Sequence, residues 1–180
     1  MKPRGPLMIE HRLIEQMIDL IKQQVSLSKS KEEVDPLFID TVVDFIRFYA
    51  DRTHHGKEED ILFHELKYKK MNDENTRIMK ELIEEHRYGR QIVNELVEAK
   101  NKYLSGQKEQ LNHITMNLQK LIDFYPGHIQ KEDKVFFPDT EKYFTAEELD
   151  GMIEAFWEFD RKMIHEKYKS VLLNLKEKLI

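Results

Sequence analysis

The sequence of 180 residues contains no cysteine at all. This absence excludes disulfide bonds, iron–sulfur clusters, thiolate zinc sites and cysteine nucleophiles. A chain without cysteine is compatible with a reducing compartment, and we expect a cytoplasmic protein.

Long apolar runs and long basic blocks are also missing. No window approaches the roughly 20 apolar residues that a membrane-spanning helix needs, and the N-terminal stretch MKPRGPLMIEH lacks the apolar segment of a signal peptide. The formal net charge is −5, and acidic and basic residues alternate along the chain. We therefore expect neither a membrane protein nor a protein that binds nucleic acid.

Glycine and proline are scarce, with 6 and 5 residues, whereas lysine, glutamate, leucine and isoleucine are frequent. The apolar fraction of 40% is enough for a core, and the charged fraction of 35% is high and mixed in sign. This composition predicts an all-α protein with a single domain over residues 1–180. We find no linker, internal repeat or low-complexity segment.

Apolar residues spaced by three and four predict four long helices and a fifth at the C-terminus. Asp35 with Pro36 marks one helix start, Asn72 or Asp73 a second, and Thr145 with Glu148 forms a capping box before the last. Short loops favour an up-down-up-down bundle over about residues 7–138, with the extra helix over about 146–178. The expected helices cover 6–27, 36–69, 73–104, a segment from about 108 past 136, and 146–178.

A histidine interrupts the apolar face of each of the four bundle helices. On the second and fourth helices, a glutamate follows the histidine by four residues and shares its face. Buried carboxylates without partners are costly, whereas imidazole nitrogens and carboxylate oxygens together suit iron, manganese or zinc. Six such ligands are too many for one tetrahedral zinc and predict two metals. The set is His11, His55, Glu59, His86, His128 and Glu132, with Glu59 and Glu132 as bridges.

Each member of this set has a simpler interpretation by itself. A lone inward histidine is usually a core residue with a satisfied hydrogen bond, and an isolated histidine–glutamate pair usually lies on the surface. The metal hypothesis depends on the compatible depth of all six residues along the bundle. The alternative that remains is a structural helical bundle without metal.

The stretches HGKEE, EEHRYGR and HIQKED, together with His11, resemble the hemerythrin-like, or HHE cation-binding, domains. The resemblance covers about Leu7 to Pro138 and implies a four-helix bundle with a non-haem di-iron centre. It implies His11, His55, His86 and His128 as terminal ligands, and Glu59 and Glu132 as bridging ligands.

The chain departs from the oxygen-carrying hemerythrins at two positions. Those proteins place a second histidine one turn after the ligand of the third helix, where this chain has Arg90. They also use an aspartate five residues after the histidine of the fourth helix, a spacing that Asp133 matches, while Glu132 fits the HHE relatives better. An open coordination position favours peroxide or redox chemistry, gas sensing or iron handling over reversible dioxygen carriage.

Two further residues, His165 and Tyr125, are candidates for a place near the metals, whereas His54 is not. His165 on the fifth helix could fill the open position, although its spacing predicts a surface histidine. Tyr125 lies one turn before His128 and could donate a hydrogen bond near the metals, although a core role is the simpler interpretation. His54 is rotated about 100° from His55 and is expected to face a neighbouring helix.

These observations predict a di-iron protein that binds or reacts with dioxygen, nitric oxide or peroxide in sensing, storage or detoxification. The alternatives are a di-iron enzyme with catalase-like or oxidase activity and the metal-free bundle. A ferritin-like oxidase is disfavoured because the chain contains no Glu-x-x-His. A homodimer through the fifth helix is a further expectation, and the sequence identifies neither an electron donor nor an output partner.

Overall fold

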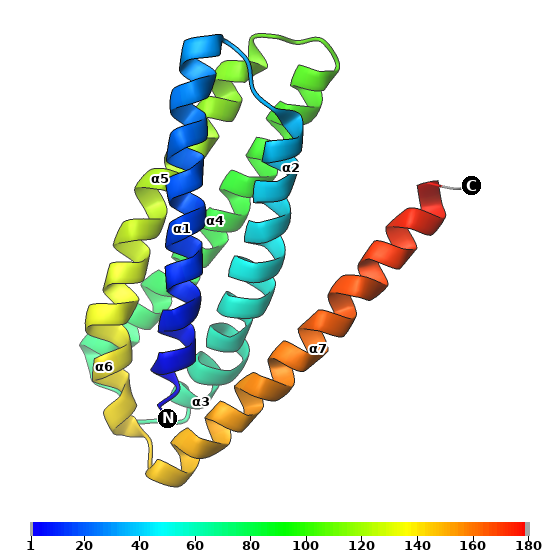
Figure 1. Cartoon of the computed structure of the whole chain (residues 1–180). Helices are drawn as coiled ribbons and strands as arrows, with labels where there is room; N and C mark the ends of the chain where they lie inside the picture. Colours follow the sequence, from blue (N-terminus) through cyan, green and yellow to red (C-terminus); the bar gives the residue numbers. More distant parts are fainter. Residues whose placement is uncertain (1, 179–180) are drawn as a thin grey trace.

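The computed structural model describes residues 2–178, with only the backbone described for residues 29, 31 and 174–178. Within that range every regular element is helical, which confirms the all-α prediction. Four upright helical columns form the bundle, and a fifth helix leaves its lower end obliquely (Figure 1). The first, third and fourth columns begin with α1 (Arg4–Lys31), α4 (Asp73–Leu104) and α5 (Gln110–Lys131).

The second column is a composite helix that changes type along its length. It starts as α2 (Pro36–Asp44), continues as the π-helical segments η1 (Phe45–His55) and η2 (Glu58–Leu62), and ends as α3 (Phe63–Leu66). The fourth column is also composite, because α5 is followed by a π-helical segment. Its remaining parts are η3 (Glu132–Phe136), α6 (Phe137–Thr140) and a short 3₁₀ turn, η4 (Glu141–Tyr143).

The sequence of the second column explains its π-helical turns. Buried side chains recur at every fourth residue from Val42 to Leu66, passing through Ala50, His54 and Glu58. In an α-helix, a step of four residues overshoots a full turn by about 40°, so such a stripe would drift off the core face. π-Helical turns, with hydrogen bonds from residue i to i+5, hold more residues and keep the stripe inward.

The helix starts expected from the sequence are confirmed. The Asp35 side chain accepts a hydrogen bond from the Leu37 amide at 2.9 Å, and Asn72 accepts one from the Asn75 amide at 2.7 Å. At the start of α7 (Ala146–Lys178), Thr145 and Glu148 form the reciprocal bonds of a capping box.

Two apolar clusters fill the interior, and buried polar side chains lie between them. The larger cluster occupies the end of the bundle that contains the α1–α2 and α4–α5 loops and includes Ile14, Ala50 and Ile92. The smaller cluster lies at the other end, where Leu7, Leu62 and Phe136 pack with the first turns of α7. Each column passes from one cluster to the other through its histidine, which places the histidines at a common depth.

The fifth helix, α7, packs its first half against the second column and then diverges from the bundle (Figure 1). Phe159 lies against Gly56, Asp160 binds the Nζ of fully buried Lys57 at 2.7 Å, and Glu166 binds Arg52 at 2.7 Å. Apolar side chains farther along α7 are exposed, and the homodimer expected through this helix stays a prediction. They include Ile164, Tyr168, Val171, Leu172 and Leu173.

Replacing Gly56 should loosen this contact. A Cβ at this position would lie 2.7 Å from Cζ of Phe159 and 3.1 Å from Cε1, so the ring and α7 must shift. We expect Gly56→Ala to cost about 1–3 kcal/mol of unfolding free energy, measured by urea denaturation. Gly151→Ala is the matched control, because its added methyl meets no atom within 4 Å and should stabilise the helix by up to about 1 kcal/mol. Equal effects of the two substitutions would contradict the packing argument.

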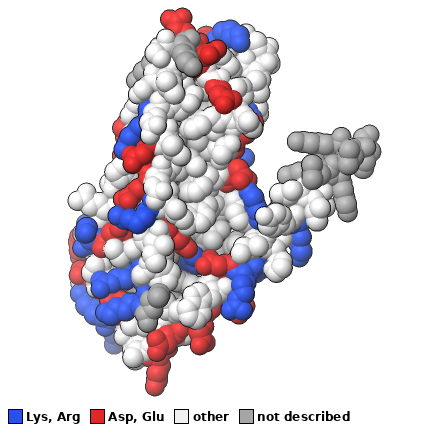
Figure 2. Space-filling model, in the orientation of Figure 1, with Lys and Arg blue, Asp and Glu red and all other residues white. Residues whose placement is uncertain are grey.

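Charges of both signs are interspersed over the face of the molecule shown in Figure 2. In the described part of the chain, no helix is both long and apolar enough to cross a membrane.

Candidate metal centre

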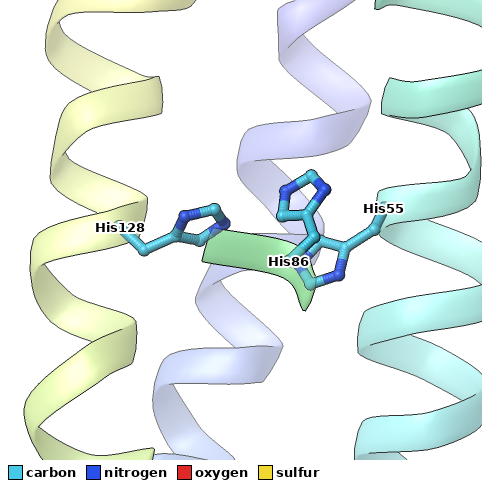
Figure 3. Close-up of side chains that lie close together, drawn as sticks. All are labelled: His55, His86 and His128. Carbon is cyan, nitrogen blue, oxygen red and sulfur yellow. The ribbon is translucent and has the colours of Figure 1, made fainter. Parts of the chain in front are cut away.

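Seven buried side chains from the four columns converge between the two apolar clusters. Their metal-binding atoms fall into two groups, and within each group these atoms lie within 4.8 Å of one another. One group is His55, His86 and His128, whose rings face a common space between the second, third and fourth columns (Figure 3). The other group is His11, His54, Glu58 and Glu132.

The two carboxylates connect the groups. Glu58 places Oε1 3.4 Å from Nε2 of His54 and Oε2 3.4 Å from Nε2 of His86. Glu132 places Oε2 3.2 Å from Nε2 of His11 and 3.4 Å from that of His128, and its Oε1 lies 3.7 Å from Nε2 of His86. Each carboxylate therefore faces histidines of both groups and could bridge two metals bound there.

The inward atoms of this set lack hydrogen bonds. Nε2 of all five histidines and both carboxylate oxygens of Glu58 and Glu132 are buried without a hydrogen-bond partner. Leaving a buried polar group unsatisfied costs about 1–3 kcal/mol, so a cluster of such groups is untenable as a plain core. Histidine nitrogens and carboxylate oxygens suit iron, manganese or zinc, and the donor set fits a pair of such ions.

The outward nitrogen of each histidine faces a carboxylate. Nδ1 of His11 lies 2.7 Å from Asp133, that of His54 lies 2.9 Å from Glu10, and that of His86 lies 2.7 Å from Glu59. Nδ1 of His128 lies 2.8 Å from Glu85, and that of His55 lies 3.4 Å from Asp51. A neutral imidazole that donates Nδ1–H to a carboxylate presents Nε2 as a metal ligand, and the carboxylate fixes the ring orientation.

The structure corrects the expectation for Glu59. Its carboxylate is partly exposed and binds Nδ1 of His86 and Nη2 of Arg90, each at 2.7 Å, whereas Glu58 points into the cluster. Glu59 faces the cluster only if the second column keeps α-helical periodicity, and the π-helical turns of η1 and η2 rotate the inward face by one residue.

The expectation for His54 is also wrong. His54 points inward with His11 and the two glutamates, and adjacent His55 points inward toward His86, with ring centroids 3.8 Å apart. His54 is therefore the fifth histidine of the cluster, which the second column supplies in place of a second histidine on the third column, where this chain has Arg90.

The remaining sequence candidates lie outside the cluster. Asp133 binds His11 and Arg12 rather than facing the inward atoms, and Arg90 binds Asp51 at 2.8 Å as well as Glu59. His165 is exposed on α7 and is not part of either group. Tyr125 is buried beside the cluster, where burial raises the pKa of its hydroxyl.

Burial and neighbouring charges raise the pKa of some ionisable groups of the cluster and lower the pKa of others. Burial lowers the pKa of His11, but the carboxylates of Asp133 and Glu132 outweigh it and raise the pKa to about 9. Burial lowers the pKa of His54 to about 4 and that of His55 well below its ordinary value. Burial and the charge of Glu132 raise the pKa of Glu58, while the nearby histidines lower that of Glu132 against its burial. In the metal-free pair a proton is therefore held more tightly by Glu58 than by Glu132.

These shifts predict a stability maximum of the metal-free protein near pH 6.5. The pKa of His11 is raised on folding, so its contribution is complete below about pH 6.5 and is lost as the pH rises through about 9. The pKa of His54 is lowered, so its contribution is present above about pH 6.5 and is lost as the pH falls towards 4. Each contribution is on the order of 3 kcal/mol. Urea midpoints of chelator-treated protein at pH 5, 6.5 and 9 should show this maximum, and a monotonic trend would contradict it.

Comparison with known families agrees with this geometry. The sequence model of the hemerythrin HHE cation-binding domain matches residues 6–140, and a second match of the same model covers residues 77–177. The chain belongs to the hemerythrin HHE family. No curated protein and no solved structure matches the chain.

The hemerythrin domain of this chain contains a repeat that the sequence interpretation missed. Glu10 and His11 on α1 correspond to Glu85 and His86 on α4, and the stretch HHGKEE corresponds to HIQKED. The contacts repeat too: Glu10 binds His54 and Lys57, and Glu85 binds His128 and Lys131. The pairing of Glu–His with His-x-x-x-Glu is a signal that could have identified His54 and Glu58.

One position breaks the correspondence between the halves of the hemerythrin centre. His55 points into the cluster, whereas the corresponding residue of the fourth column, Ile129, belongs to the apolar cluster. The centre therefore has three histidines in one group and two in the other. Bound metals would supply Lewis acidity and redox capacity, and the two groups would give two such ions unequal surroundings.

Proposed function

We propose that this chain is a non-haem di-iron protein that binds or reacts with a small molecule such as dioxygen, nitric oxide or peroxide. The observation that carries the proposal is the set of buried, unpartnered Nε2 and carboxylate oxygen atoms from four columns. Membership of the hemerythrin HHE family supports cation binding by this domain, and iron is our choice among the metals that such donors accept.

The protein's own part in this function is to hold and separate the two ions. Glu58 and Glu132 would bridge the two ions. His55, His86 and His128 would bind one ion. The other ion would be bound by only two histidines, His11 and His54, and would therefore have fewer protein ligands. The carboxylates on the Nδ1 side hold each ring in place, so the ligands need little rearrangement on binding. The ion with fewer protein ligands is our candidate for binding the small molecule.

Metal quantitation with optical spectroscopy tests the proposal. Protein produced with ample iron should contain two iron ions per chain and show an oxidised-form absorption band that changes on adding azide or peroxide. Fewer than one metal ion per chain in a correctly folded protein would favour the metal-free bundle instead.

Access to the centre favours peroxide turnover as a second candidate. A cavity of about 320 Å³, bounded by η1, α4 and Tyr125, reaches His55 and His86. Rapid oxygen release from added peroxide would establish a catalase-like enzyme, while a reversible spectral change without turnover would favour binding or sensing.

A further inference from the structure

The fifth helix carries a row of exposed apolar side chains where it leaves the bundle (Figure 1). At about 100° per residue, the directions of these side chains fall within about 60° of one another around the helix. They form the outer row, which consists of Trp157, Ile164, Tyr168 and Val171, with exposed fractions of 51, 57, 66 and 39%. A contiguous row of large exposed apolar side chains marks an interaction surface.

The outer row does not face the bundle. Met163 is the buried side chain at this level of α7, and it points roughly 100° around the helix from the outer row. Farther along, Glu166 binds Arg52 at 2.7 Å. Lys167 binds Asp44, so the side of α7 that faces the second column is polar here. Closing α7 onto the bundle would leave the outer row in solvent, and covering the row therefore requires a second molecule.

The charges of α7 favour a second copy of this chain as that molecule. Residues 146–160 contain six acidic residues and no basic one, whereas residues 161–173 contain four basic residues and one acidic residue. An antiparallel pair of α7 helices places the acidic half of each copy against the basic half of the other, while a parallel pair places like charges together. The helix is therefore complementary to itself, as a two-fold symmetric interface requires.

An antiparallel pair centred near Ile164 also matches the individual side chains. Positions at equal distances on either side of the centre meet, so Trp157 of each copy lies beside Val171 of the other. Glu158 likewise lies beside Lys169 of the other copy. Both of these charged side chains are exposed, and the helical period places them on the same flank of the outer row.

We propose that α7 is the dimerisation element of this protein and that two copies pair their α7 helices antiparallel through the outer row. Burial of the apolar side chains stabilises the dimer, and the opposite charges of the two halves set its direction. The inference goes beyond the proposed function and does not depend on it, since neither group of metal-binding residues includes a residue of α7.

Analytical ultracentrifugation of the full chain tests the dimer. We expect a monomer–dimer equilibrium in the wild-type protein. Ile164→Asp should raise the dimer Kd about 100-fold, because it buries an unpaired charge at the centre of the interface. Ile9→Asp is the matched control, since Ile9 is 64% exposed on α1, away from the outer row. A wild-type protein that stays monomeric up to millimolar concentration, or equal effects of the two substitutions, would overturn the inference.

A charge exchange tests the pairing between the two halves. Glu158→Lys should raise the dimer Kd about tenfold, because it places lysine against Lys169 of the other copy. Adding Lys169→Glu to the same chain should restore the wild-type Kd. A double variant that dimerises no better than Glu158→Lys would contradict this pairing.

A spin label measures the direction of the helices. The chain has no cysteine, so Asp150→Cys provides a single labelling site on the exposed side of α7. In an antiparallel dimer centred near Ile164, the two labels lie about 40 Å apart along the helices, whereas in a parallel dimer they lie about 10 Å apart. The short distance would overturn the antiparallel arrangement.

Discussion

Glu58→Gln should reduce the metal content at saturating iron from two ions per chain to one or fewer, while Glu59→Gln should still bind two. Both oxygens of Glu58 point into the cluster and face histidines of both groups, so the amide removes a charged bridge from the point where the ions meet. Glutamine keeps the volume of the buried side chain, which protects the fold.

Glu59→Gln acts through His86 instead. The Glu59 carboxylate lies 2.7 Å from Nδ1 of His86 and on the outer side of the ring. Loss of such a carboxylate weakens metal affinity by about 10- to 100-fold but leaves the ligand count unchanged. Metal quantitation at saturating iron separates the two substitutions, and circular dichroism confirms that both variants remain helical. If Glu59→Gln lost an ion and Glu58→Gln did not, the result would support Glu59 as the metal ligand, as expected from the sequence.

Removal of the metals should lower the melting temperature by about 8–16 °C. At a free metal concentration about 1,000 times the Kd, binding contributes about 4 kcal/mol, and each kcal/mol moves the melting temperature of a domain of this size by about 2–4 °C. The physical source is the buried set of unsatisfied nitrogen and oxygen atoms, which repel or remain unpaired without cations.

Calorimetry with and without chelator measures this effect. Glu58→Gln is a useful control, because a protein that has lost metal already should show a smaller response to chelator. A chelator-independent melting temperature in the wild-type protein, at confirmed loss of metal, would show that the cluster is stable without cations.

The helices and the four-column bundle could be predicted from the sequence because both follow from local patterns. Apolar spacing identifies the columns, and Asp35, Asn72 and Thr145 mark helix starts through bonds to amides two or three residues away. The histidines of the first, third and fourth columns were also identifiable, since His11, His86 and His128 interrupt regular apolar faces.

The inward face of the second column could not be predicted with α-helical geometry. The α-helical period places His55 and Glu59 on one face, and the alternative of His54 and Glu58 differs by a single residue. The π-helical turns bring His54, His55 and Glu58 inward together, and such turns are stabilised by the packing of the whole stripe against the other columns. The repeat between the two halves was visible in the sequence, but its meaning depends on which atoms meet.

The sequence by itself determined an all-α bundle, its column boundaries and a supply of histidine and carboxylate ligands, because these depend on residue type and short-range spacing. Only the tertiary structure decided that Glu58 faces both groups of histidines while Glu59 binds His86 from outside the cluster, and that His55 makes the two groups unequal. Those outcomes depend on which side chains of each column face the interior. A π-helical turn holds more residues than an α-helical turn, and this difference is enough to turn a neighbouring residue inward instead.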